Sequence, residues 1–295
     1  MPESPSTTTD WITAAIGELA AAQNTDGGWP YRSGGVSSTE ATSLAVLAIT
    51  ALQPGSATLQ PAMAWLAARQ STNGAFTISA ECPDASWVTP LAGLTLARNG
   101  GADAAQSAAA LLLGETVFVL DPVPTSMYGY DTSIPGWPWT FGDYSFTEPT
   151  ALAAVFLKQQ GYAQHDRVRQ AMAALLTRAL ASGGWNYGES IVLGSQLYPA
   201  AAPTALALLA MADEQDATTA AAVTWLAGQL GSLSSLFSLG WTAIAMNVLG
   251  RLDDAWTAEV ITRWQGTPVQ RRNPLDTALC LLGLAPRAGH ALALG

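Results

Sequence analysis

The sequence predicts an all-α fold, a closed α6/α6 toroid in which six helical hairpins form two concentric layers. Three observations lead to this prediction. An apolar helical segment recurs six times, an amphipathic segment precedes each copy, and the last repeat ends in an apolar helix. Because the end repeats of an open array need polar outer faces, an apolar final helix favours closure into a ring. An open array of helical pairs is the alternative.

The predicted inner segments each start at a threonine and continue with Ala, Leu and Val. They are apolar nearly all round, which is typical of fully buried helices. Successive copies lie 35 to 61 residues apart. The six threonines are Thr42, Thr89, Thr150, Thr204, Thr242 and Thr277.

The predicted outer segments carry large apolar residues at helical spacing, as Trp256, Val260 and Trp264 do, so one face must pack inward. The third of them, 104–113, is rich in alanine and less clearly patterned. We expect a flexible N-terminus at 1–9, one domain at 10–285 and a C-terminal tail at 286–295. The expected repeats within the domain are 10–52, 59–98, 102–159, 163–212, 216–249 and 253–284.

The composition restricts the function. Only 12% of the residues are charged, against roughly 25% in ordinary soluble domains. The 12 basic and 22 acidic residues give a net charge of −10, which excludes nucleic acid as a partner and disfavours anionic lipid. An apolar patch could still contact a membrane. No signal peptide, apolar run of 18 residues or disulfide framework is evident, so we expect a cytoplasmic protein, with membrane association and oligomeric state left open.

A short motif follows two of the outer segments in register with the repeat. The first copy is Leu19-x3-Gln23-x3-Gly27-x-Trp29. Leu66, Gln70, Gly74 and Phe76 form the second copy, and Leu175, Gly183 and Trp185 form a third that lacks the Gln. Glycine permits the sharp turn, and the Gln can bond free backbone groups at the helix end.

This pattern resembles the QW repeat of squalene-hopene cyclases and other members of the prenyltransferase–squalene cyclase superfamily. The resemblance implies a terpene cyclase whose acid is the middle Asp of a DxDD motif, just before Thr-Ala. Here Leu275 holds the acid's place and only the final Asp, Asp276, remains. The chain therefore resembles an atypical, single-toroid member that lacks DxDD.

Two other repeats carry a carboxyl group at the acid's place, two residues before the aligned Thr. They are Glu40 and Glu148, which we predict to be catalytic. In an apolar ring such a group has a raised pKa and can donate a proton near neutrality, although an unactivated alkene demands a stronger acid. Repeats one and three are too far apart for a direct Glu–Glu hydrogen bond, so we expect Asp131 and Asp143 as partners. The alternative role is to complement the helix dipole.

The longest interruption, 121–146, is rich in aromatic residues. Aromatic faces stabilise carbocations and also suit contact with a polyprenyl chain. The alternatives are a lid held by its own packing and, for residues near helix starts, ordinary core packing. The predicted substrate-binding residues are Trp87, Trp137, Trp139, Phe141, Tyr144, Phe146, Trp241 and Tyr187.

We expect no metal or cofactor. Asp276, Cys280 and His290 are similar to the zinc ligands of protein prenyltransferases in type alone, because their spacing and order differ. A diphosphate on a substrate would need Arg271, Arg272 or Arg32, and an arginine pair is more often solvated surface.

The resulting prediction is an enzyme that cyclises, isomerises or hydrates a polyprenyl or terpenoid substrate in a central apolar cavity. A non-catalytic isoprenoid-binding toroid is the first alternative. An (α/α)6 glycosidase, which also pairs acids in an aromatic cleft, is the second.

Overall fold

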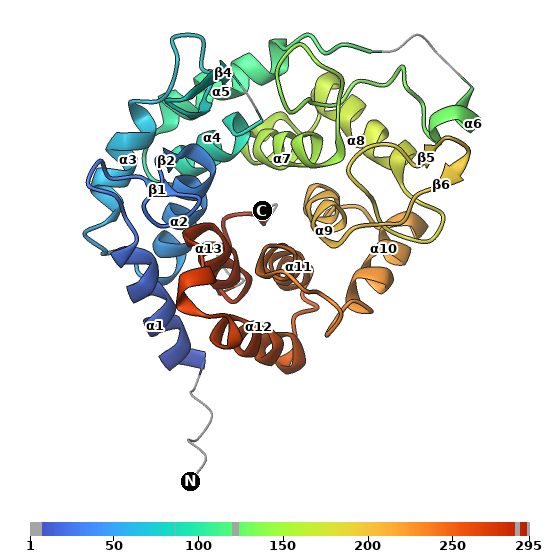
Figure 1. Ribbon diagram of the computed structural model, residues 1–295. Helices are drawn as coiled ribbons and strands as arrows, with labels where there is room; N and C mark the ends of the chain where they lie inside the picture. Colours follow the sequence, from blue (N-terminus) through green and yellow to red (C-terminus); the bar gives the residue numbers. More distant parts are fainter. Residues whose placement is uncertain (1–7, 86, 120–123, 287–289, 294–295) are drawn as a thin grey trace.

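The structure, a computed structural model, describes residues 8–85, 87–119, 124–286 and 290–293. Within these ranges the chain forms two concentric layers of helices around a common axis (Figure 1). The inner helices are α2 (Thr39–Leu52), α4 (Thr89–Arg98), α7 (Thr147–Leu157), α9 (Ala201–Ala210), α11 (Leu236–Val248) and α13 (Pro274–Gly283). The outer helices are α1 (Thr8–Ala21), α3 (Leu59–Ala67), α5 (Ala102–Gly114), α8 (Asp166–Arg178), α10 (Ala217–Ala227) and α12 (Asp254–Gly266).

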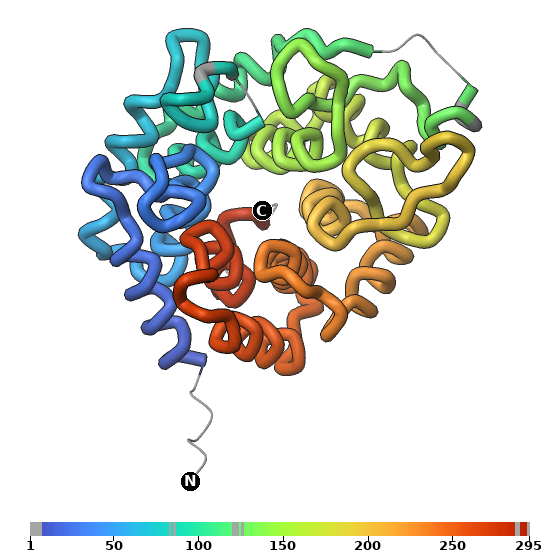
Figure 2. Tube along the Cα trace, viewed as in Figure 1, coloured from blue at the N-terminus to red at the C-terminus, as the bar shows by residue number. Residues whose placement is uncertain are grey.

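The ring is closed, as predicted. Helix α13 of the last repeat packs against α2 of the first, and α1 packs against α12 and α13. At this junction the indole rings of Trp11 and Trp264 meet edge to face, with their centroids 5.7 Å apart. Figure 2 shows the first helix of the chain, in blue, side by side with the last two, in red. Closure therefore buries the apolar faces that an open array would expose.

Four of the six aligned threonines fasten an aromatic residue of the preceding loop to their own inner helix. The hydroxyl oxygen of Thr42 accepts the backbone N–H of Trp29 at 2.8 Å. The same bond joins Thr89 to Phe76 at 3.0 Å, Thr150 to Trp137 at 2.8 Å and Thr204 to Trp185 at 2.9 Å. This shared contact explains why a threonine recurs at the start of a buried, otherwise apolar helix.

The glutamines of the loop motif join neighbouring repeats. Gln23 donates from its amide to the carbonyl of Gly27 at 2.8 Å and to that of Thr58, at the start of α3, at 2.9 Å. Gln70 donates in the same way to Gly74 at 3.1 Å and to Ala104 of α5 at 2.7 Å. One side chain thus joins the motif glycine to the start of the next outer helix.

Short elements that the sequence analysis did not anticipate lie in the loops. They include three two-stranded antiparallel hairpins, the helix α6 (Thr125–Tyr128), a π-helical turn η1 (Lys158–Tyr162) and a 3-10 turn η2 (Val269–Arg271). The hairpins are β1 (Trp29–Pro30) with β2 (Ser37–Ser38), β3 (Thr77–Ser79) with β4 (Cys82–Ala85), and β5 (Ile191–Val192) with β6 (Ser195–Gln196).

The chain ends differ from the expected boundaries. Helix α1 starts at Thr8, inside the segment 1–9 that we expected to be flexible, and residues 1–7 lie outside the described part. The described part of the expected tail enters the ring. Leu292 is fully buried, and Gln159 donates to the carbonyls of Ala291 and Ala293 at 3.0 and 3.1 Å. The tail thereby closes the end of the ring at which α7 and α13 finish.

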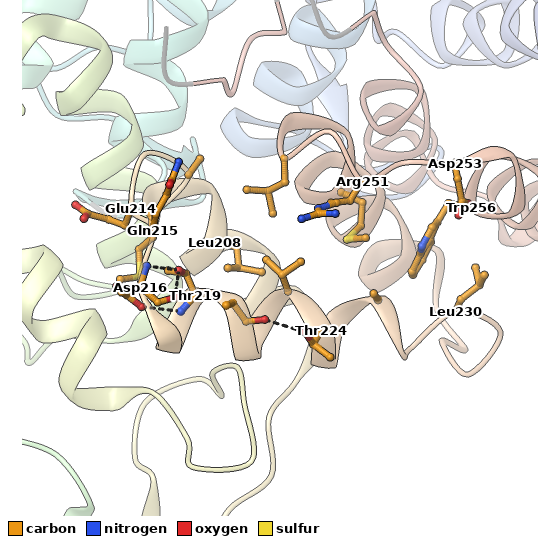
Figure 3. Close-up of a pocket in the computed structure, with 17 residues that line it drawn as sticks. Leu208, Glu214, Gln215, Asp216, Thr219, Thr224, Leu230, Arg251, Asp253 and Trp256 are labelled. Atoms are coloured by element: carbon orange, nitrogen blue, oxygen red, sulfur yellow. Dashed lines mark hydrogen bonds between the residues drawn. The ribbon is translucent and has the colours of Figure 1, made fainter.

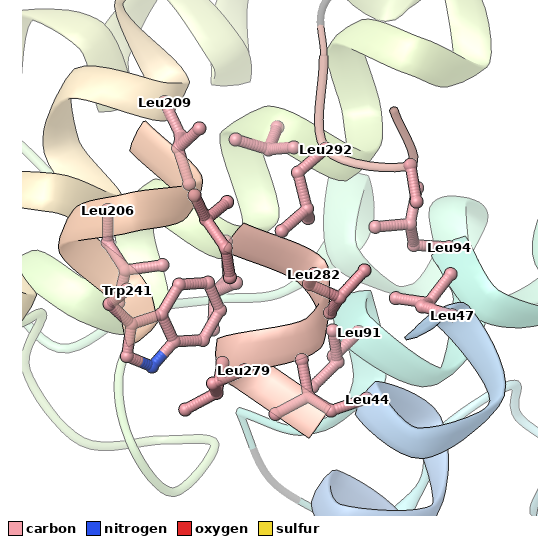
Figure 4. Packing of buried hydrophobic residues seen from close by; sticks show 14 of the residues in the cluster. Leu44, Leu47, Leu91, Leu94, Leu206, Leu209, Trp241, Leu279, Leu282 and Leu292 are labelled. Atoms are coloured by element: carbon pink, nitrogen blue, oxygen red, sulfur yellow. The ribbon is translucent and has the colours of Figure 1, made fainter. Parts of the chain in front are cut away.

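Leucine side chains fill the middle of the ring, as Figure 4 shows. They come from several inner helices and from the tail, and none exposes more than 2% of its surface. The leucines are Leu44, Leu47, Leu91, Leu94, Leu206, Leu209, Leu279, Leu282 and Leu292.

No helix among the described residues has both the length and the apolar composition needed to cross a bilayer.

Candidate active site

Three carboxyl groups occupy the N-terminal ends of inner helices: Glu40 on α2, Glu148 on α7 and Asp276 on α13. Glu40 and Glu148 expose only 6% and 5% of their surfaces. They are linked electrostatically, since the charge of Asp276 acts on Glu40 and that of Glu40 acts on Glu148. The three groups therefore form one carboxyl cluster at the mouth of the ring, opposite the end closed by the tail.

Burial raises the pKa of Glu40 to about 7, helped by the negative charge of Asp276 and opposed by a hydrogen bond from Tyr31. Burial likewise raises the pKa of Glu148 to about 7, and the charge of Glu40 adds to the effect. The pKa of Asp276 is also raised by burial, against a hydrogen bond from Asn273. Near neutral pH the cluster can both donate and accept protons, which general acid–base chemistry requires.

Tyr31 is a member of the site that the sequence analysis missed. It follows β1, and the pairing of Trp29 with Ser38 brings it to the start of α2. Its phenol donates a hydrogen bond to the carboxylate of Glu40, and burial together with that charge raises the pKa of the phenol. A tyrosine shortly after the motif tryptophan was the available signal, but nothing local in the sequence marks it as a partner of Glu40.

The aromatic residues predicted to bind substrate fall into separate groups. Trp87 and Trp139 come from different loops and meet edge to face, with ring centroids 4.9 Å apart. Tyr144 and Phe146 stack at 5.8 Å, while Phe141 packs half-buried against the core. Tyr187 is more than half exposed. Burial of the remaining part raises the pKa of its phenol, and the negative charge of Glu148 raises it further. Tyr187 is thus the predicted aromatic residue that the electrostatics link directly to the cluster.

Two of the predicted substrate contacts have structural roles instead. Trp137 is 1% exposed, donates from its indole to Leu112 at 3.2 Å, and lies under the Arg167 guanidinium at 3.9 Å. Trp241 packs among the central leucines, and its indole nitrogen is buried with no hydrogen-bond partner in the described chain. For both residues the core-packing alternative describes the observed surroundings.

Asp131 and Asp143 form local turns. Asp131 accepts hydrogen bonds from the backbone and hydroxyl of Ser133, which lower its pKa. Asp143 is exposed and accepts the N–H of Tyr144 at 2.8 Å. Neither is among the groups that shift the pKa of Glu40 or Glu148, so we do not include them in the proposed chemistry.

The residues considered as zinc ligands point to no metal site. His290 bonds to the carbonyl of Leu282 at 3.0 Å, at the end of α13 opposite Asp276. No group of three His, Cys, Asp or Glu side chains in the described residues is arranged to hold a metal ion. Of the arginines considered for a diphosphate, Arg272 pairs with Glu18 at 3.3 Å and lies over the Trp264 ring at 3.9 Å.

A large groove lies elsewhere, between the outer helices α10 and α12 (Figure 3). Its volume is about 990 Å³, and its walls include Met211, Met246 and Trp256, with Arg251 and Glu214 among the polar residues. None of the site residues predicted from the sequence lines this groove. It is therefore separate from the carboxyl cluster.

Comparison with known proteins supports the fold. No protein-family model matches the chain, and no curated protein matches it. Among solved structures, the type II terpene cyclase MstE from Scytonema matches in a ligand-free variant with a TM-score of 0.59, at 20% identity over 89% of this chain and 79% of that one. A variant in complex with its substrate geranylgeranyl dihydroxybenzoate gives 0.58, at 19% identity over 89% and 80%.

A second kind of protein shares the architecture. An α-amylase from Clostridium perfringens matches with a TM-score of 0.60, at 10% identity, over 96% of this chain and 98% of that one. At these identities the likeness concerns the fold and not the activity. The chain thus has a terpene cyclase-like α/α toroid fold.

Proposed function

We propose that this protein is an enzyme that carries out acid–base chemistry on an isoprenoid substrate at the carboxyl cluster. The observation that supports the proposal most strongly is the burial of Glu40 and Glu148 at the same mouth of the ring, where the charge of Glu40 acts on the protonation of Glu148. The MstE structures contain a geranylgeranyl substrate and the product merosterolic acid A, which suggests the class of ligand.

In the proposed reaction Glu148 is the acid and Glu40 is the base. The half-exposed Tyr187 stands beside Glu148 and can contact a cationic intermediate through its ring. Tyr31 donates to Glu40 and so stabilises its carboxylate form. Proton donation from one group and removal by the other converts the substrate into an isomer, by ring closure or by movement of a double bond.

The strength of the acid restricts the substrate. A carboxyl group with a pKa of about 7 is far weaker than the acid that an isolated alkene needs. We therefore propose that the substrate carries a more basic acceptor, an epoxide, whose oxygen takes the proton from Glu148. The C–O bond opens to leave a hydroxyl group, and Glu40 then removes a proton from carbon, so that the product is an isomer of the substrate. The same reasoning makes an unmodified hydrocarbon chain a poor substrate.

The direct test is incubation of the purified protein with farnesol, geranylgeraniol, their terminal epoxides, squalene and the prenyl diphosphates, followed by mass spectrometry. We expect a product isomeric with an epoxide substrate, in which a hydroxyl group has replaced the epoxide ring. Glu148→Gln and Glu40→Gln should each lower turnover by at least about a hundredfold. Glu214→Gln, on an exposed loop, is the matched control and should keep full activity.

Two outcomes would point to the alternatives. A stoichiometric, unchanged isoprenoid in native mass spectra, with no turnover of any substrate, indicates a binding protein. Hydrolysis of starch or maltooligosaccharides that depends on Glu148 and Glu40 indicates a glycosidase, the function favoured by the α-amylase likeness and by paired carboxyl groups.

A further inference from the structure

Apolar side chains are exposed together on one hairpin beside the mouth of the ring. The turn between β5 and β6 presents Leu193, which is 100% exposed, and Tyr198 and Tyr187 are 86% and 57% exposed. Val192 and Leu197 complete this set of five residues, which we term the apolar hairpin patch. Helix α6 packs against β5 on one side of it.

Leu193, at the tip of the hairpin, has an unfavourable backbone conformation as well as an apolar side chain exposed to water. Leu193 has a φ of +50°, and no other described residue except glycine has a positive φ. Two-residue hairpin turns with this geometry favour Asn or Gly at that position, because a larger side chain crowds the backbone. Exposure to water and the left-handed backbone both disfavour a leucine at this position in the isolated protein. The simplest explanation of the leucine is therefore an interaction with another molecule.

The shape of the hairpin indicates what it contacts. A stable protein interface buries about 800 Å² on each partner, which is more than a two-residue turn offers. A narrow apolar tip flanked by tyrosines suits a lipid bilayer instead, because tyrosine partitions to the boundary between headgroups and acyl chains.

The charges around the hairpin indicate which lipid. No Lys or Arg occurs between Arg178 and Arg251, and the neighbouring residue Glu189 is acidic. The segment 179–250, which contains the patch, therefore offers no cation to an anionic headgroup, and the net charge of −10 repels such surfaces.

The patch also has a defined position relative to the site. The carbonyl of Tyr187 accepts the N–H of Thr147 at 2.9 Å, one residue before Glu148. We propose that the apolar hairpin patch inserts into the surface of an electrically neutral lipid bilayer and holds the mouth of the ring toward it. This proposal is independent of whether the carboxyl cluster is catalytic.

Flotation of the full chain with vesicles tests it. We expect the protein to float with pure phosphatidylcholine vesicles, to bind less when 30% phosphatidylserine is included, and to bind equally well in high salt. Leu193→Asn should lower the bound fraction about tenfold, because one leucine leaves the bilayer. Asn suits the left-handed turn, so this variant should remain folded, which circular dichroism and thermal unfolding verify.

Val269→Asn is the matched control, since Val269 is also more than half exposed but lies on the distant turn η2. It should float like the original protein. The proposal is overturned if the original chain does not float, if Leu193→Asn floats equally well, or if Val269→Asn loses as much binding. A dimer that Leu193→Asn dissociates, without vesicle binding, would also overturn it by identifying a second copy as the partner.

Discussion

Glu40 and Glu148 hold equivalent positions in two repeats, yet their surroundings give them different properties. The N-cap of α2 is Ser38, whose hydroxyl accepts the N–H of Ala41, so Glu40 is not needed as the cap. Its carboxylate instead accepts a hydrogen bond from the phenol of Tyr31. The pKa of Glu148 is determined by burial and by the charge of Glu40, which both raise it. The favourable helix dipole is too small to outweigh burial at either position.

The raised pKa of Glu148 predicts a dependence of stability on pH. The folded state holds the proton up to about pH 7, whereas the unfolded chain loses it near 4.5, so ionisation favours unfolding as the pH rises between these values. Glu148→Gln removes this cost. Relative to the original protein, the variant should gain about 2–3 kcal/mol between pH 5 and pH 8.

Urea unfolding of both proteins at several pH values measures this change. The predicted sign is a stabilisation that grows with pH and levels off above about pH 8. A difference between the two proteins that stays constant from pH 5 to pH 8 would contradict the prediction.

At the scale of elements, the hydrogen bond from an aromatic loop to a threonine is the recurring link between a hairpin's two helices. Thr204 is fully buried, accepts the N–H of Trp185 at 2.9 Å and donates to its carbonyl at 3.0 Å. Thr242 occupies the aligned place in the next repeat, but its buried hydroxyl has no partner in the described chain. The link is therefore absent at Thr242, whereas the third repeat keeps it between Thr150 and Trp137 although it also lacks the loop motif.

Two isosteric substitutions test this difference. Thr204→Val should lower the free energy of unfolding by about 1–3 kcal/mol, because it leaves the backbone N–H of Trp185 buried and unpaired. Thr242→Val should be neutral or stabilising, because it removes a hydroxyl group that makes no bond. Chemical denaturation of the two variants gives both values, and equal losses would show that the hydrogen bond is not what distinguishes the repeats.

At the scale of the whole molecule, the ring is closed laterally by the α1–α12 junction and at one end by the tail. The leucine layers and Leu292 fill its middle, so the apolar centre predicted from the sequence is largely packed with side chains. The ligand of the proposed function would therefore bind at the end of the ring that carries Glu40 and Glu148.

Leu292→Ala tests how far the tail contributes to the ring. Leu292 is fully buried, and truncating such a side chain typically costs about 2–5 kcal/mol. Leu176→Ala, on the outer helix α8 and 41% exposed, is the control and should cost less than about 0.5 kcal/mol. Thermal unfolding measures both, and a neutral Leu292→Ala would show that the tail only rests on the ring.

The candidate site was predictable in part. Glu40 and Glu148 are found by aligning the repeats, because an equivalent position in each hairpin faces the same end of the ring. Tyr31 was not predictable, since it reaches Glu40 through the β1–β2 hairpin. The sequence did not indicate that Asp276 acts on Glu40, because this role depends on contact between the last repeat and the first.

The sequence by itself determined the number of hairpins, the order of inner and outer helices and the closure of the ring. These follow from helical periodicity and from apolar faces that must be buried, both of which are local properties of the chain. Only the tertiary structure decided that the tail enters the ring, that Trp137 and Trp241 pack as core, and which carboxyl groups share one environment. Those outcomes depend on burial and on charges brought together from distant repeats, which no local pattern records.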